Sequence, residues 1–325
     1  MRRRHALAAL AVMLGAPRPG VAQRPPARIG YLTADTPTAN PQRLQALREG
    51  LRELGQFEGR SVVIEPRWAE GRFERLPDLA AELVRLPVQV IVAVGDPVVT
   101  AARQVTATIP IVMASVGDPL GRGFIQSFAR PGGNITGVSN FSISLVGKWL
   151  ESLKEAVPAL ARVAVLRNAV NATHILFWHE AQAVALRLGL QVQAVDVART
   201  DDIDGALTAI RNAGAGALVV LPDALLSGIL TRRIADLALE QRLPTMCTFS
   251  EQAVLGCLMS FGPDLTRNHH RAAFYVDRIL KGANPAELPV EQPSRFVSVV
   301  NLRSAKALGI AIPQTLLLRA DNVIS

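Results

Sequence analysis

The sequence predicts an α/β protein made of two similar lobes, each with a parallel sheet flanked by helices. Strand-like and helix-like segments alternate with short connections, an order typical of parallel sheets that are covered on both faces. Two short runs rich in Val and Ile, 88–94 and 109–115, have the composition of strands buried on both faces. The same order begins again near Asn140, and 325 residues suffice for two domains of about 150 residues each.

The first half of the chain is predicted to form one lobe. A helix is indicated where Leu44, Leu47 and Leu51 recur at helical spacing before Gly55. Strands are indicated where short apolar runs end in turn-forming residues. The predicted strands are 28–32, 61–68, 88–94, 109–115 and 135–138, and the predicted helices are 44–54, 76–86 and 98–104.

The second half repeats this alternation. The segment IPIVMAS at 109–115 has a counterpart in LPTMCTF at 243–249, and AVGDP at 93–97 has one in VLPDA at 220–224. The similarity lies in order and not in residue identity, so it predicts two lobes of one topology. The predicted strands are 162–166, 191–197, 217–221, 243–249, 257–261 and 296–302, and the predicted helices are 145–157, 174–188, 203–213, 227–241 and 267–280.

Residues 1–22 have the features of a secretory signal peptide. Arg2–Arg4 form a positive start, an apolar stretch of about 11 residues follows, and Gly20-Val21-Ala22 offers small residues before a cleavage site. That stretch is shorter than the roughly 20 residues a membrane span needs. We therefore predict a soluble protein exported to the periplasm that does not span the membrane once the signal is removed. The paired arginines leave both Sec and twin-arginine export open.

The net charge of +8 does not indicate nucleic-acid binding. Residues 1–22 contain four arginines and no acid, so their removal lowers the formal charge to +4. The remaining chain has no run of five basic residues and no basic stripe with interleaved aromatic residues. We therefore expect no nucleic-acid partner.

The two cysteines, Cys247 and Cys257, leave two alternatives open. An oxidising compartment permits a disulfide, and both residues lie at the edges of predicted strands that could be neighbours. Their spacing does not establish the geometry that a bridge requires. A disulfide and two free buried thiols are therefore equally compatible with the sequence.

The motifs of common enzyme classes are missing from the sequence. No G-x-G-x-x-G follows the first strand, and there is no P-loop and no G-x-S-x-G turn. His174 and His179 are five residues apart, and His269 and His270 are adjacent, so neither pair faces one way on a helix. We therefore predict no catalytic residues, no metal site and no cofactor, and hence a protein that is not an enzyme.

Polar and turn-forming residues gather instead at the ends of the predicted strands, where open parallel sheets bind their ligands. Asp96 and Pro97 suit the start of a helix, so backbone N–H groups near Asp96 and Asp118 could meet polar groups of a ligand. Capping of their own helices competes with this role for both Asp residues, and a hinge role competes with it near Asn140. The candidate ligand-binding residues are Thr33, Gly95, Asp96, Pro97, Ser115, Gly117, Asp118, Asn140, Phe141, Asn168, Asp223 and Phe249.

Several ordered motifs carry a resemblance to a known family. Among them are RIGYL at 28–32, IPIVMASVGDP at 109–119, ARPGGNITGVS at 129–139, LMSFGPDL at 258–265 and NLRSAKALGIAIPQTLLLRADNVI at 301–324. Together they resemble the ABC-transporter substrate-binding proteins related to the tryptophan-binding TrpX type, over nearly all of residues 28–325. The resemblance implies a type I periplasmic binding protein with two Rossmann-like lobes. Such a protein delivers a small solute, often an amino acid or aromatic acid, to a membrane permease with its ATPase.

The resemblance also implies a hinge of three segments. We expect the crossings between the lobes near Asn140, Ser250 and Pro293. The expected N-terminal lobe is 28–139 plus 257–294, and the expected C-terminal lobe is 140–256 plus 295–325.

The sequence departs from the family pattern at positions that bear on the ligand. Asp96 stands where a small or hydroxyl residue is common, and Cys247 stands where an aromatic residue is frequent. Gln252 and Cys257 also replace common residues, namely Tyr or Phe and Gly. An added carboxylate and fewer aromatic rings favour a smaller or partly cationic solute over tryptophan.

The sequence thus predicts a monomeric solute-binding protein of an ABC importer that captures an amino-acid-like solute or small organic acid. The ligand is expected to bridge both lobes and so to bind the closed form better than the open one. One alternative is a periplasmic sensor for a membrane receptor, which neighbouring permease and ATPase genes would argue against. The other is a cleft hydrolase using Asp96, Asp118 or Asp223, which a turnover screen would test.

Overall fold

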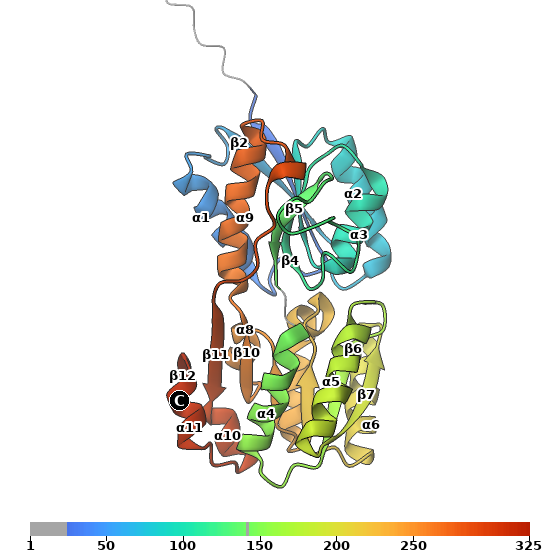
Figure 1. The fold of residues 1–325 in the computed structure, drawn as a ribbon, viewed down its shortest axis with the longest axis vertical. Helices are drawn as coiled ribbons and strands as arrows, with labels where there is room; N and C mark the ends of the chain where they lie inside the picture. The colour runs from blue at the N-terminus through green and yellow to red at the C-terminus, as the bar shows by residue number, and fades with distance from the viewer. Residues whose placement is uncertain (1–24, 141–142) are drawn as a thin grey trace, which may run out of the picture.

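The structure is a computed structural model that describes residues 25–140 and 143–325. It shows two α/β lobes, one above the other in Figure 1. The predicted signal peptide, 1–22, and the candidate residue Phe141 lie outside the described residues. Among the helices of the described residues, none is both long and apolar enough to cross a membrane.

The first lobe contains a five-stranded parallel sheet. In spatial order its strands are β2 (Val62–Trp68), β1 (Ala27–Thr33), β3 (Val90–Val94), β4 (Ile111–Val116) and β5 (Ile135–Ser139). Helices α2 (Leu76–Arg85) and α3 (Asp96–Val105) cover one face, and α1 (Pro41–Glu53) and α9 (Leu265–Leu280) cover the other. The two central Val- and Ile-rich strands, β3 and β4, are buried throughout, as predicted for strands covered on both faces.

The second lobe contains a seven-stranded sheet. In spatial order its strands are β12 (Asn322–Ile324), β11 (Phe296–Asn301), β10 (Met259–Pro263), β9 (Thr245–Cys247), β8 (Ala217–Val220), β6 (Arg162–Asn168) and β7 (Gln191–Val197). One face carries α4 (Val146–Ala156), α5 (His174–Leu188), α10 (Leu302–Leu308) and α11 (Gln314–Arg319), and the other carries α6 (Ile203–Asn212) and α7 (Thr231–Glu240). The prediction of two α/β lobes is confirmed. This second sheet is mixed, however, because β10 and β11 pair antiparallel.

The chain passes between the lobes three times, and one crossing differs from the prediction. The crossings after β5 and through 291–295 agree with the expected positions near Asn140 and Pro293. The second crossing does not lie near Ser250 or at 257, because β10 pairs with β9 and β11 of the second sheet. It lies between Pro263 and Leu265, where the chain enters α9 and returns to the first lobe. A short apolar strand looks the same in either sheet, and only its partners decide which lobe it joins.

A disulfide joins Cys247 to Cys257, which decides between the two alternatives that the sequence left open. Cys247 ends β9, and Cys257 lies just before β10, the parallel neighbour of β9. The two Cα atoms are 6.5 Å apart. The bridge closes the segment that carries Phe249 and the short helix α8 (Ser250–Val254). This segment forms part of the site described next.

Candidate functional site

A polar cavity lies between the two lobes, where the carboxyl ends of their strands face one another. Its volume is about 40 Å³, so the lobes leave little free space between them. The first lobe contributes residues that follow β1, β3 and β4, and the second contributes residues that follow β6, β8 and β9. The site therefore lies at the sheet edges that open α/β folds use for ligand binding.

Eight of the twelve predicted residues line this cavity: Thr33, Gly95, Asp96, Pro97, Ser115, Asn140, Asp223 and Phe249. Gly117 and Asn168 lie behind the wall and donate hydrogen bonds to Asp96 and Asp223, respectively. Asp118 is not brought to the cavity. Its carboxylate accepts the N–H of Gly121 (2.8 Å) within its own loop.

The structure adds lining residues that the sequence reasoning missed, among them Asp35, Arg43, Phe73, Asn171 and Ser227. A signal existed for Arg43, which lies four residues before Leu47 and eight before Leu51. It therefore occupies the apolar face of a predicted helix, where an arginine needs a partner. No comparable pattern marked the other four, because Asp35 and Asn171 lie in loops and Phe73 and Ser227 lie in single short turns of 3-10 helix (Phe73–Arg75) and π-helix (Leu225–Ile229).

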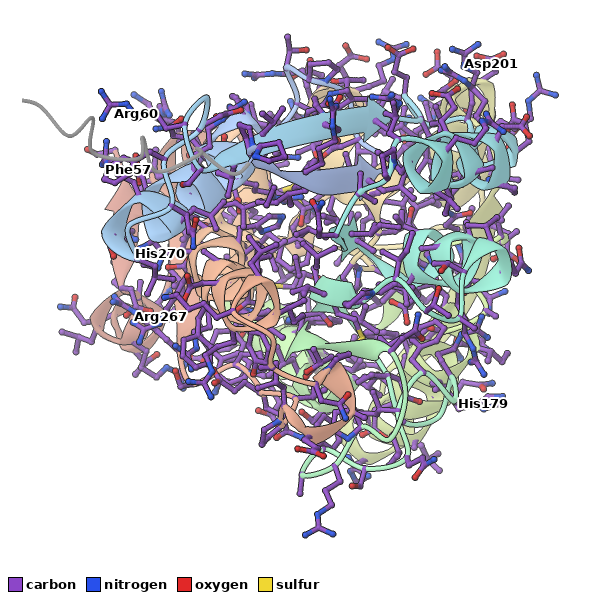
Figure 2. All side chains as sticks on the ribbon, turned by 90° about the horizontal axis from the view of Figure 1, so that it is seen from above. Phe57, Arg60, His179, Asp201, Arg267 and His270 are labelled. Atoms are coloured by element: carbon purple, nitrogen blue, oxygen red, sulfur yellow. A yellow bond between two sulfur atoms is a disulfide. The ribbon has the colours of Figure 1, made fainter. Side chains whose placement is uncertain are left out.

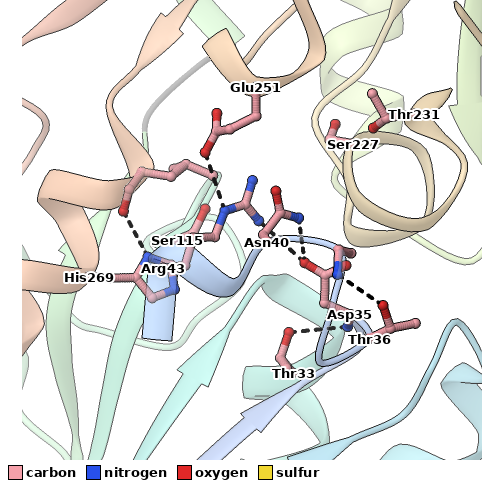
Figure 3. A network of polar contacts seen from close by, with 12 residues as sticks. Thr33, Asp35, Thr36, Asn40, Arg43, Ser115, Ser227, Thr231, Glu251 and His269 are labelled. Atoms are coloured by element: carbon pink, nitrogen blue, oxygen red, sulfur yellow. Dashed lines mark hydrogen bonds and ion pairs between the residues drawn. The ribbon is translucent and has the colours of Figure 1, made fainter. Parts of the chain in front are cut away.

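Arg43 is the one cation among the described residues that line the cavity, and only 5% of its surface is exposed. Its Nη1 lies 3.6 Å from Asp35 Oδ2 and its Nε 3.6 Å from Glu251 Oε1, so each ion pair is longer than a hydrogen bond (Figure 3). Its guanidinium lies over the ring of Phe249, 5.7 Å from the centroid. Asn40 Nδ2 donates to Asp35 Oδ2 (2.7 Å). Burial raises the pKa of Asp35, and the nearby Arg43 opposes this rise.

Asp96 connects the two lobes. Its Oδ2 accepts the N–H of Gly117 (3.0 Å), and its Oδ1 accepts the hydroxyl of Thr173 (3.1 Å) from the second lobe. Both bonds reach outside its own helix α3, whose N-cap residue is Gly95. Burial raises the pKa of Asp96, and these two hydrogen bonds oppose the rise.

Asp223 is held by three N–H donors. Asn168 Nδ2 and Asn171 Nδ2 each donate at 2.9 Å, and the backbone N–H of Leu225 donates at 2.8 Å. These bonds tie the loop after β6 to the loop after β8. Asp223 therefore acts as a rigid part of the wall.

The two histidines of α5 lie in opposite environments. His174 is buried, accepts the N–H of Asn168 at Nδ1 (2.9 Å), and donates from Nε2 to the carbonyl of Pro222 (3.2 Å). Burial lowers the pKa of His174, which favours this neutral form. His179 lies at the outside of the molecule in Figure 2. Within 25–140 and 143–325, no three or more His, Cys, Asp or Glu side chains are grouped to hold a metal ion.

His269 is buried beside Arg43 (Figure 3). Its Nδ1–H donates to the carbonyl of Leu265 (2.8 Å). Burial, together with the positive charge of Arg43, lowers the pKa of His269 to about 3. His269 is therefore neutral at physiological pH and adds no positive charge to the site.

The lobes are in contact across the cavity, so the structure shows a closed form. A Cβ added to Gly228 of the second lobe would lie 2.2 Å from Asp35 Oδ1 of the first lobe. A Cβ added to Gly71 would lie 2.9 Å from Ile229 Cδ1. Phe73 packs against the apolar cores of both lobes. These contacts would be lost if the lobes separated.

Two α/β lobes that close over a polar cavity define a two-lobed binding protein. The chain belongs to the ABC transporter substrate binding protein family, whose model matches residues 38–324. This match confirms the resemblance noted in the sequence. Because the members of this family bind solutes, it also confirms that the protein is a binding protein and not an enzyme.

Individual relatives agree with this membership. A tyrosine-binding protein of Clostridioides difficile is 22% identical over 85% of this chain and 77% of its own length. A conserved domain protein of Vibrio cholerae superposes with a TM-score of 0.86 at 26% identity, over 91% of this chain and 99% of its own. An ABC domain of Streptococcus pneumoniae in complex with L-Trp gives 0.85 at 25% identity, over 92% and 100%.

Proposed function

We propose that this protein is the periplasmic solute-capturing subunit of an ABC importer and that it binds an amino-acid-like solute or small organic acid between its lobes. The observation that carries the proposal is the polar cavity enclosed by groups from both lobes. The relatives named for tyrosine binding and for a complex with L-Trp support the amino-acid class. The residues that line the cavity are the proposed ligand contacts.

The proposed mechanism is a shift between open and closed populations. The hydrogen bond from Thr173 to Asp96 and the ion pair of Arg43 with Glu251 both join one lobe to the other. A solute that touches both lobes has full contact only in the closed form, so it stabilises that form. The three crossings after β5, after β10 and through 291–295 would absorb the rotation.

The proposed partners follow from the family. A membrane permease and its ATPase would receive the solute from the closed protein, which we expect to be a monomer. Export through the signal peptide 1–22 would place the mature chain in the periplasm. Cell fractionation of the full-length protein should therefore recover it, shortened at its N-terminus, with the periplasmic contents.

Two measurements on the mature chain test the proposal. Mass spectrometry of gently denatured protein should identify a co-purified small solute. Small-angle scattering should show a more compact particle when that solute is added to stripped protein. Identical scattering profiles with every solute tried, together with no co-purified molecule, would contradict the proposal.

A further inference from the structure

We propose that the solute is an α-amino acid with a small side chain, whose carboxylate binds Arg43 and whose ammonium group binds Asp35 and Asn140. This inference rests on the proposed function, because it specifies the solute of the same cavity. It also differs from what the names of the relatives suggest, since those name tyrosine and L-Trp.

Four buried polar atoms of residues that line the cavity lack hydrogen-bond partners within the described residues. Asp35 Oδ1, Asn140 Oδ1, Arg43 Nε and Arg43 Nη2 are buried, and none makes a hydrogen bond within the described residues. All three residues line the cavity. Buried polar groups in native proteins are nearly always hydrogen-bonded. A solute that reaches these residues from the cavity would supply the missing partners.

The unpaired donors and acceptors match a carboxylate and an ammonium group, respectively. A guanidinium group is the donor best matched to a carboxylate, which it can hold with two parallel bonds. Asp35 Oδ1 and Asn140 Oδ1 only accept, and an ammonium group offers three donors. Neither Asp96 nor Asp223 has an unpaired oxygen, because both oxygens of each already accept hydrogen bonds.

The positive and negative charges of the site lie close together. Arg43 Nη1 and Asp35 Oδ2 are 3.6 Å apart, so the solute must present opposite charges close together. The ammonium and carboxylate of an α-amino acid are attached to the same carbon and meet this condition. A simple organic acid does not, because Asp35 and Glu251 already place two carboxylates around the single guanidinium of Arg43.

The small size of the cavity limits the side chain of the solute. The volume of about 40 Å³ in this closed form is small, which favours a solute with a short side chain such as glycine, alanine or serine. Phe73 closes one side of the cavity, and its ring packs against apolar residues of both lobes. An indole or phenol side chain would have to displace that ring and separate the lobes.

A panel of small compounds tests the inference by calorimetry on stripped mature protein. Glycine, alanine and serine carry both charges, propionate lacks the ammonium, and ethylamine lacks the carboxylate. We expect the best of the three amino acids to bind about 100-fold more tightly than propionate, ethylamine or tryptophan, because a lost partner leaves a buried group unpaired. Equal or tighter binding of tryptophan, or of a compound lacking one charge, would overturn the inference.

Three variants test the residue assignments, with the fold of each checked by circular dichroism. Arg43→Lys and Asp35→Asn should each weaken binding of the preferred amino acid by about 10- to 100-fold. Phe73→Ala should shift the preference toward larger side chains. Arg48→Lys is the matched control, because Arg48 lies on the same helix but pairs with Glu58 on the surface. Folded variants of Arg43 and Asp35 that bind like the control would refute the assignment.

The outcomes separate this inference from the proposed function. If a solute co-purifies and closes the lobes but is not an α-amino acid, the importer role stands and the inference fails. If no solute binds and none co-purifies, the proposed function fails as well.

Discussion

The contact between Gly228 and Asp35 gives the sharpest prediction about closure. In Gly228→Ala the new Cβ would lie 2.2 Å from Asp35 Oδ1 and 3.0 Å from its Cγ, well inside the 3.4 Å at which ordinary contact begins. Asp35 is held by Asn40 and Arg43, so it cannot turn aside without losing these contacts. The closed form must therefore open by an ångström or more, or accept the overlap.

The expected size of this effect follows from the cost of such overlaps. Overpacking by one methyl group costs about 1–3 kcal/mol, and about 1.4 kcal/mol is a factor of ten in affinity. We therefore expect Gly228→Ala to weaken solute binding by about 10- to 100-fold. The fold should not suffer, because Gly228 lies in a π-helical turn, Leu225–Ile229, and does not have a positive φ. Alanine is also the better helix former there.

Calorimetry with the co-purified solute measures the affinity, and small-angle scattering measures closure. Gly205→Ala is the matched control, because Gly205 lies in α6 and an added Cβ meets no atom within 4 Å. The control should bind like the wild type. If Gly228→Ala binds equally well and closes fully, the contact between Gly228 and Asp35 does not limit closure and the reasoning fails.

Three further predictions concern other parts of the fold. Thr173→Val removes the hydrogen bond from Thr173 to Asp96 that joins the two lobes (3.1 Å). Calorimetry should show solute binding weakened by about tenfold, because a hydrogen bond to a charged group contributes about 1.5–3 kcal/mol. Replacing Cys247 and Cys257 by Ser opens a bridge with a sequence separation of 10 and should lower the free energy of unfolding by about 2–3 kcal/mol in urea titrations. His269 should make the free energy of unfolding fall as the pH drops below 6.5 toward its folded-state pKa of about 3. The reason is that the unfolded chain binds the proton at a higher pH than the folded chain does, which gives a slope of up to about 1.4 kcal/mol per pH unit.

Matched variants give these predictions their controls. Thr208→Val alters an exposed threonine of α6 and should leave solute affinity unchanged, so equal effects at both threonines would count against the cross-lobe bond. A reducing agent should lower the free energy of unfolding of the wild type by the same amount as the serine replacements do. It should not change the free energy of unfolding of the serine variant. His269→Gln should flatten the pH dependence between pH 6.5 and 4.5, whereas exposed His179→Gln should not. If the free energy of unfolding of His269→Gln depends on pH as steeply as that of the wild type, another group causes the pH dependence.

Much of the fold and part of the site followed from the sequence alone. The alternation of short apolar strands with amphipathic helices predicted two α/β lobes, because each local period matches one kind of element. Eight lining residues were found because parallel strands bring their carboxyl ends to one edge of a sheet. These are consequences of local pattern plus one general rule of topology.

The tertiary structure decided what depends on pairing between distant segments. Hydrogen bonds to β9 and β11 place β10 in the second lobe. The pairing of β9 with β10 also brings Cys247 close enough to Cys257 to form the disulfide. Arg43 and Asp35 lie in the same lobe, but their site is completed by Glu251 only because the two lobes meet, since the ion pair of Arg43 with Glu251 joins residues more than 200 positions apart. No local propensity encodes such contacts, because they form when the folded lobes close and not when each element forms.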